Sequence, residues 1–222
     1  MRFIRAVVFD LDDTLYDYEA CNRIAEHDLE QLVEKDLGIS HADFSYYYSQ
    51  AKQVVKQRVP NTGSSHNRLL YVQTFLELIG NNPIDKAISL YNAYWDSMLV
   101  NMTPFPYVSR LFTALQGRGL KIGILTDLTS HIQHRKLRAL GLVPYIDAFV
   151  SSEEAGVEKP DKKAFHLMLH KLLLPPDRVL MIGDSVKKDC HGAEKVGMFS
   201  LLFERQFADS FDARCLEWLN AA

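Results

Sequence analysis

Cysteine is scarce in this chain of 222 residues. The three cysteines, Cys21, Cys190 and Cys215, are odd in number, scattered, and without the spacing of a metal site. A small protein held together by disulfides needs paired cysteines at closer intervals. The pattern therefore excludes a disulfide framework and indicates free thiols in a reducing compartment.

The sequence also lacks a long apolar run and an excess of positive charge. No apolar segment is long enough to span a bilayer, and the N-terminus has no signal-peptide pattern. The formal net charge of −3 argues against a surface that coats nucleic acid, which would need clustered Lys and Arg. We therefore expect a cytoplasmic protein, monomeric or homodimeric, that binds neither a membrane nor a nucleic-acid polymer.

Short apolar segments typical of buried strands alternate with amphipathic helical segments in most of the chain. Such alternation predicts an α/β fold with a doubly wound parallel sheet, that is, a Rossmann-like core. A loop is expected at 153–160. The predicted strands are 4–9, 120–125, 148–151, 179–182 and 198–203, and the predicted helices are 107–118, 130–140, 162–173, 187–196 and a last one around 213–219.

One block interrupts this alternation directly after the first strand. Residues 18–100 show helical periodicity and no convincing strand. The expected domains are a catalytic core, 1–17 with 101–222, and an inserted all-helical cap, 18–100, placed over the carboxyl edge of the sheet. Within the cap, 60–65 has the composition of a loop, and the predicted helices are 19–35, 43–58, 68–79 and 83–98.

The first strand ends abruptly in two acids, Asp10 and Asp12. Desolvating one carboxylate beside another is costly unless a cation neutralises them. Active sites of open α/β sheets lie at the carboxyl ends of the strands. The alternative is a turn whose aspartates cap backbone groups. The first interpretation predicts an enzyme with a catalytic aspartate beside a metal ion.

Three further points place polar groups at or after predicted strand ends: Thr126, Lys159, and Asp184 with Asp189. In a parallel sheet these ends share one edge, so the side chains should converge. Carboxylate oxygens suit Mg²⁺, while an ammonium and a hydroxyl suit phosphoryl oxygens. Together they predict phosphoryl transfer.

These motifs, in this order, resemble those of the haloacid dehalogenase-like hydrolase superfamily, in particular its Mg²⁺-dependent phosphatase branch. The resemblance covers the whole chain and includes a helical cap inserted after the first motif. The segments that carry it are 9–14, 125–126, 158–161 and 183–189.

The resemblance implies a role for each residue. Asp10 would be the nucleophile that forms an aspartyl-phosphate. Asp12 would protonate the leaving oxygen and later accept a proton from water. The Asp10 and Asp184 side chains and the Asp12 backbone carbonyl would hold Mg²⁺. Asp189 would orient Lys159 or a metal-bound water rather than touch the metal.

Thr126 and Lys159 would bind the transferring phosphoryl group. The residue after Thr126 departs from the family pattern, because Asp127 stands where asparagine is common. An acid there would repel a phosphate unless it turns away, so we expect Asp127 to cap the next helix. It stays a weak candidate for substrate binding.

The cap offers a group of basic, amide and aromatic side chains around the Gly-Ser loop. They could recognise the leaving group or a second phosphate, with Arg58 and Arg68 the substrate-binding candidates; they could equally be exposed loop residues. The resemblance carries none of them over. The group is Arg58, His66, Asn67, Arg68 and Tyr71.

The predicted function is Mg²⁺-dependent hydrolysis of a small phosphorylated metabolite, such as a nucleoside monophosphate or a sugar phosphate, through an aspartyl-phosphate. Two alternatives remain open. A phosphosugar mutase of the same superfamily would share all four motifs. A non-catalytic ligand-binding member would usually have lost the nucleophile, the metal aspartate or the lysine, and here Asp10, Asp12, Lys159 and Asp184 are all present.

Overall fold

The computed structural model describes residues 3–221 and divides into two compact units. The core unit is Met1–Asp17 with Thr103–Ala222, and the helical unit is Tyr18–Met102. Among the described residues, no helix combines the length and the apolar character needed to cross a bilayer.

The core unit is built on a five-stranded parallel sheet of order β3-β2-β1-β4-β5. The chain starts on the central strand, moves outward to β3, and then returns to β4 on the other side of β1. The strand order therefore reverses between β1 and β4, which is where ligands bind in open α/β sheets. The predicted doubly wound parallel sheet is confirmed. Its strands are β1 (Ala6–Phe9), β2 (Lys121–Thr126), β3 (Ala148–Ser151), β4 (Val179–Gly183) and β5 (Phe199–Leu202).

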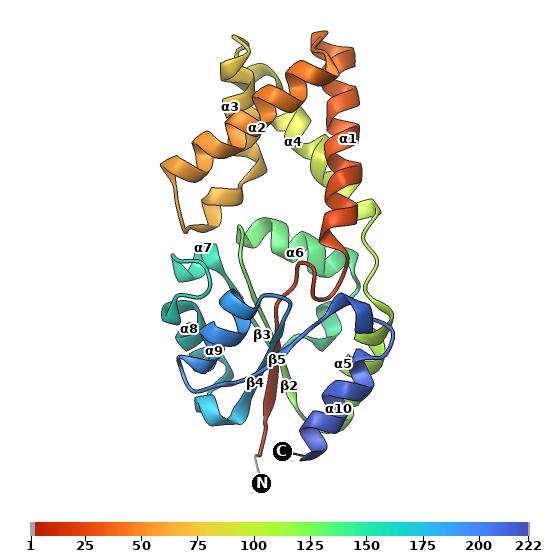
Figure 1. Ribbon diagram of the computed structural model, residues 1–222, viewed down its shortest axis with the longest axis vertical. Coiled ribbons are helices and arrows are strands. Elements are labelled where there is room, and N and C mark those ends of the chain that lie inside the picture. Colours follow the sequence, from red (N-terminus) through yellow and green to blue (C-terminus); the bar gives the residue numbers. More distant parts are fainter. Residues whose placement is uncertain (1–2, 222) are drawn as a thin grey trace. The chain divides into compact units, whose positions relative to one another are not determined.

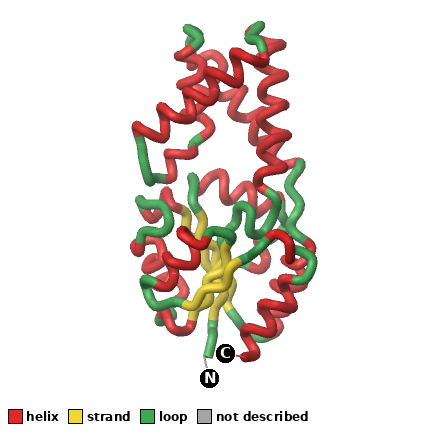
Figure 2. The backbone as a smooth tube through the Cα atoms, viewed as in Figure 1, coloured by secondary structure: helices red, strands yellow, loops and turns green. Residues whose placement is uncertain are grey.

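Helices flank the sheet on both sides (Figures 1 and 2). In Figure 1, α8 and α9 lie on one side of the strands, and α5 and α10 lie on the other. The helices of the core unit are α5 (Pro106–Gly117), α6 (Ser130–Ala139), α7 (Ser152–Ala155), α8 (Lys162–Leu172), α9 (His191–Glu194) and α10 (Phe211–Ala221).

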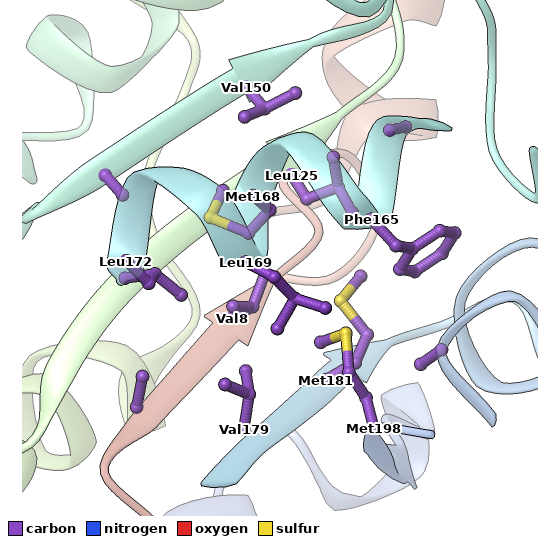
Figure 3. Packing of buried hydrophobic residues seen from close by; sticks show 14 residues of the cluster. Val8, Leu125, Val150, Phe165, Met168, Leu169, Leu172, Val179, Met181 and Met198 are labelled. Carbon is purple, nitrogen blue, oxygen red and sulfur yellow. The ribbon is translucent and has the colours of Figure 1, made fainter. Parts of the chain in front are cut away.

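Strand β1 is buried on both faces, which explains its unbroken apolar sequence. Val8 belongs to the cluster that packs against α8 (Figure 3), whereas the ring of Phe9 contacts that of Phe112 on α5, with ring centroids 4.9 Å apart. In Figure 3, α8 crosses the strands and its Met168 and Leu172 reach down to them. Burying each such side chain contributes roughly 1.5–3 kcal/mol.

The helical unit contains four α-helices, and a capping residue precedes three of them, α2, α3 and α4. Ser40, Asn67 and Asn82 each accept a hydrogen bond from a backbone N–H in the first turn of the helix they precede. The predicted cap helices agree in type with those observed, which are α1 (Tyr18–Leu37), α2 (His41–Arg58), α3 (Arg68–Leu78) and α4 (Pro83–Val100).

Three segments differ from the prediction. The expected loop 153–160 begins inside α7, because the Ser151 side chain accepts the Glu154 N–H at 3.2 Å and caps a single helical turn. The expected loop 60–65 contains a 3₁₀ turn, Gly63–His66. The expected helix 187–196 is a π-helical turn, Val186–Cys190, followed by α9.

Arg110 on α5 and Asp212 on α10 form a two-pronged ion pair, with N–O distances of 2.8 and 2.9 Å. The Arg110 hydrogen bond lowers the pKa of Asp212. A carboxyl group whose pKa is lowered by folding stabilises the fold when the pH is above the pKa it has in the unfolded chain, about 3.9. This contribution to stability disappears as the pH falls through the folded-state pKa.

Asp212→Asn should therefore lower the melting temperature at pH 7 and have little effect at a pH well below that of the folded-state titration. Circular dichroism melts at both pH values would measure this. Asp177→Asn is the control, because Asp177 is exposed and its nearest arginine nitrogen is 3.9 Å away. An equal loss for Asp212→Asn at both pH values would contradict the assignment.

Candidate active site

The candidate site lies at the carboxyl ends of β1 and β4, the two adjacent strands where the sheet order reverses. Asp10 follows β1, and its N–H donates to the Ile182 carbonyl at 2.9 Å, so the ladder continues one residue past the strand. Asp184 follows β4. The sheet thus brings together two carboxylates that are 174 positions apart in the sequence.

Asp189 completes a cluster of acids with Asp10 and Asp184. One carboxylate oxygen from each lies within 4.8 Å of the other two. Lys159 reaches into this cluster, and its Nζ donates to Asp10 Oδ1 at 2.6 Å and to Asp189 Oδ1 at 2.7 Å. Asp10, Asp189 and Lys159 are buried, whereas Asp184 is exposed.

The electrostatics of this cluster are unbalanced. Three carboxylates and one ammonium leave two negative charges when all are ionised. Burial raises the pKa of Asp10 well above its usual range; Lys159 lowers it, and Asp189 and Asp184 raise it further. Burial opposes the charge of Lys159, yet Asp10 and Asp189 raise its pKa overall, so the ammonium stays charged. The pKa of Asp184 is raised by desolvation and by Asp189.

Backbone geometry holds Asp189 under β4. Its Oδ2 accepts the Ser185 N–H at 3.0 Å across the π-helical turn, so both of its oxygens are engaged. A Cβ atom on Gly183 would lie 2.2 Å from Asp189 Oδ2, so only glycine fits at the end of β4. Thr14 fixes the other acid, because its Oγ1 accepts the Asp184 N–H at 3.1 Å and donates to Asp184 Oδ1 at 3.3 Å.

Thr126 ends β2 and is buried at the same edge of the sheet. Its Oγ1 accepts a hydrogen bond from Gln133 Nε2 at 2.6 Å and donates to the Asp127 carbonyl at 3.3 Å. Gln133 lies on α6, and the same Nε2 also donates to the Asp127 carbonyl at 2.7 Å. The amide of Gln133 therefore fixes the orientation of the Thr126 hydroxyl.

The expectation that Asp127 caps the next helix is wrong, because Thr129 occupies the N-cap position of α6. Asp127 instead joins two loops. Its Oδ1 accepts the Lys159 N–H at 3.0 Å, and its Oδ2 accepts Lys188 Nζ at 2.8 Å. The acid after Thr126 is thereby neutralised and holds the backbone of Lys159. Its weak assignment to substrate binding stays a prediction.

Asp12 is held by two side chains that the sequence analysis missed. Lys136 Nζ on α6 donates to Oδ1 at 2.7 Å and to Oδ2 at 2.8 Å, and the Tyr16 hydroxyl donates to Oδ1 at 2.6 Å. Lys136 and Tyr16 are both fully buried.

The sequence did contain a signal for Lys136 and Gln133. The buried positions of α6, together with the residue that follows the helix, recur every three or four residues. Two of these buried positions are occupied by polar residues. A lysine or glutamine in an apolar stripe must have a buried polar partner. The stripe is Ile132, Gln133, Lys136, Leu137 and Leu140.

The cap candidates lie in the helical unit, and they are not alike. Arg58 is exposed near the end of α2. Arg68 is buried, which excludes for it the alternative of an exposed loop residue. Its guanidinium donates to the His66 carbonyl, the Tyr18 hydroxyl and the Asn22 side chain.

The other cap candidates have structural partners. Asn67 caps α3 by accepting the Leu69 N–H at 2.9 Å. Tyr71 is buried, and its hydroxyl donates to the Ser65 carbonyl at 2.7 Å.

Comparison with known proteins identifies the family. A sequence profile of the haloacid dehalogenase-like hydrolases matches residues 4–197, which include all four motifs. The chain belongs to this family. As a haloacid dehalogenase-like hydrolase it is an enzyme, and its parallel sheet with flanking helices is the fold that the resemblance implied.

Three relatives illustrate the range of this hydrolase family. The ribulose-1,5-bisphosphate 5-phosphatase of Halopiger xanaduensis is 38% identical over 90% of this chain and 84% of its own. The glyceraldehyde 3-phosphate phosphatase of Methanopyrus kandleri is 31% identical over 91% and 84%. The hydrolase YfnB of Bacillus subtilis, solved bound to magnesium, is 25% identical with a TM-score of 0.66, over 90% of this chain and 89% of its own.

Gly183→Ala tests how closely the hydrolase site depends on the space under β4. The added methyl should displace the Asp189 carboxylate and with it Lys159. Displacing a positioned group by about 1 Å can lower the rate on the order of 100-fold, while overpacking costs roughly 1–3 kcal/mol of stability. Steady-state hydrolysis and a thermal melt measure the two effects. Gly117→Ala is the control, since a Cβ there meets no heavy atom within 4 Å. Equal activity of the two variants would contradict the prediction.

Proposed function

We propose that this hydrolase is a Mg²⁺-dependent phosphatase that acts on a small phosphorylated metabolite through an aspartyl-phosphate. The observation that carries the proposal is the buried cluster of Asp10, Asp189 and Lys159 beside Asp184. The related phosphatases that act on ribulose-1,5-bisphosphate and glyceraldehyde 3-phosphate support the substrate class.

The donor set fits a hard divalent cation. Its ligands are carboxylate oxygens, which Mg²⁺ prefers, and the excess of two negative charges equals the charge of one such ion. The Asp10 and Asp184 side chains and the Asp12 backbone carbonyl would hold it, and Asp189 would hold Lys159 instead. When bound, Mg²⁺ would neutralise charge around the transferring phosphoryl group. The magnesium bound to YfnB supports this choice of ion.

Asp10 is suited to nucleophilic attack because, among the described residues, a hydrogen bond engages one of its two oxygens. Lys159 holds Oδ1 at 2.6 Å, which leaves Oδ2 to form the bond to phosphorus. The contact with Lys159 favours the ionised carboxylate that attack requires, against the effect of burial. Lys159 and the Thr126 hydroxyl would then contact the phosphoryl oxygens.

Asp12 would serve as the acid and base. It lies two residues from the nucleophile, and its side chain keeps 27% exposure, so a leaving group and a water molecule can reach it. It would give a proton to the leaving oxygen and take one from the water that hydrolyses the aspartyl-phosphate.

The experiment that tests this function is phosphate release from a panel of sugar phosphates, triose phosphates and nucleoside monophosphates. The wild type should release phosphate from at least one of them. Asp10→Asn removes the nucleophile without changing the size of the side chain, so turnover should fall to background while the circular dichroism spectrum is unchanged.

Three outcomes would contradict the proposal. Substantial turnover by Asp10→Asn would exclude the covalent step. Phosphosugar isomerisation without net phosphate release would identify a mutase, and tight ligand binding without turnover would identify a non-catalytic member.

Removal of the metal gives a separate prediction. Phosphate release should disappear after treatment with EDTA and return on addition of Mg²⁺, because the cluster, when fully ionised, carries two more negative than positive charges, which would repel an anionic substrate without the metal. When Mg²⁺ is added back in increasing concentrations, the Asp184→Asn variant should require more Mg²⁺ than the wild type for half-maximal activity, since one carboxylate ligand is lost. Full activity in EDTA would contradict the role of the metal.

A further inference from the structure

The Asp12 carboxylate accepts three hydrogen bonds from two buried side chains. Oδ1 accepts two hydrogen bonds, one from Lys136 Nζ and one from the Tyr16 hydroxyl, whereas Oδ2 accepts one, from Lys136 Nζ. A carboxylate has about four lone-pair positions, two on each oxygen. Within residues 3–221, the position without a donor is on Oδ2.

Burial separates the carboxylate from the groups that hold it. The side chain of Lys136 has no exposed surface, and Tyr16 is equally enclosed, while the side chain of Asp12 keeps 27% exposure. The ammonium also lies 5.9 Å from the centre of the Tyr16 ring, a favourable cation–π distance. A lysine without solvent access has few alternative positions, so it fixes the plane of the carboxylate it contacts.

The same helix positions the other polar group of the second motif. Gln133 lies three residues before Lys136 on α6, and it fixes the Thr126 hydroxyl. Residues three apart on a helix share a face. One face of α6 therefore orients both the acid after β1 and the hydroxyl at the end of β2.

We propose that Lys136 is a positioning residue for Asp12 and that Oδ2 is the oxygen that exchanges the proton. This inference rests on the proposed function. As the Asp10 Oδ2–phosphorus bond forms and the bond to the leaving oxygen breaks, the proton on Asp12 Oδ2 passes to the leaving oxygen. Water then attacks phosphorus and gives its proton to Asp12 Oδ2, and the bond to Asp10 breaks to release phosphate.

Lys136→Met tests the proposal, because methionine fills most of the space of the lysine stem without an ammonium. With an alkyl phosphate, whose leaving oxygen needs the proton, turnover should fall on the order of 100-fold, which is the usual contribution of a general acid or base. Arg138→Met is the control on the same helix, since Arg138 is exposed; its turnover should match the wild type.

The second substrate, p-nitrophenyl phosphate, separates positioning from a merely structural role. Its leaving group needs little protonation, so Asp10 should still be phosphorylated, whereas hydrolysis of the aspartyl-phosphate should be slow. Lys136→Met should then release a burst of p-nitrophenol equal to the enzyme concentration, and the wild type should not. A folded Lys136→Met variant with wild-type turnover of both substrates would overturn the proposal.

A double-mutant comparison covers the case in which Lys136→Met does not fold, because Asp12→Asn removes the charge that Lys136 balances. Asp12→Asn alone and Asp12→Asn with Lys136→Met should show equal rates of phosphate release. A further tenfold loss in the double variant would mean that Lys136 acts independently of Asp12. Full activity of Asp12→Asn would instead refute the acid–base role in the proposed function, so the two failures are distinguishable.

Discussion

The contact of Lys159 with Asp10 and Asp189 is the interaction on which the site depends. Without the ammonium, two buried carboxylates would face each other unpaired, and the pKa of Asp10 would rise further. Removing one member of a buried ion pair typically costs roughly 3–5 kcal/mol. The surroundings are arranged to keep Lys159 in place: Asp127 holds its backbone N–H, and Gly183 leaves room for Asp189.

A second layer of polar contacts comes from α6, behind the strand ends. Gln133 orients the Thr126 side chain and Lys136 orients the Asp12 side chain through hydrogen bonds. Gln133 and Lys136 are buried at positions where an ordinary amphipathic helix would have apolar residues. These two positions of α6 therefore bury less apolar surface, and their side chains orient residues of the site instead. Such local departures from a hydrophobic pattern are expected where a protein positions reacting groups.

The sequence predicted those features that depend on local pattern. Strand ends that carry Asp10, Thr126 and Asp184 could be placed because the strands are short apolar runs and parallel strands share one edge. The contact between Lys136 and Asp12 spans 124 positions, and no local period encodes it. The sequence did not predict the contacts of Asp127 for the same reason. A capping preference depends on neighbouring residues, whereas Lys159 and Lys188 contact Asp127 from distant parts of the chain.

Asp10 and Asp12 illustrate how the environment can assign different chemistry to two identical side chains. Asp10 is buried, one of its oxygens is held by a lysine, and its other oxygen is open. Asp12 is more exposed, three of its four acceptor positions are taken, and its lysine lies on α6, whereas Lys159 lies in the turn before α8. Under the proposed mechanism an open oxygen on a buried carboxylate suits bond formation to phosphorus, and a single free position on a solvent-accessible carboxylate suits proton exchange. Two carboxylates two residues apart can thus perform two steps of one reaction because each has its own lysine.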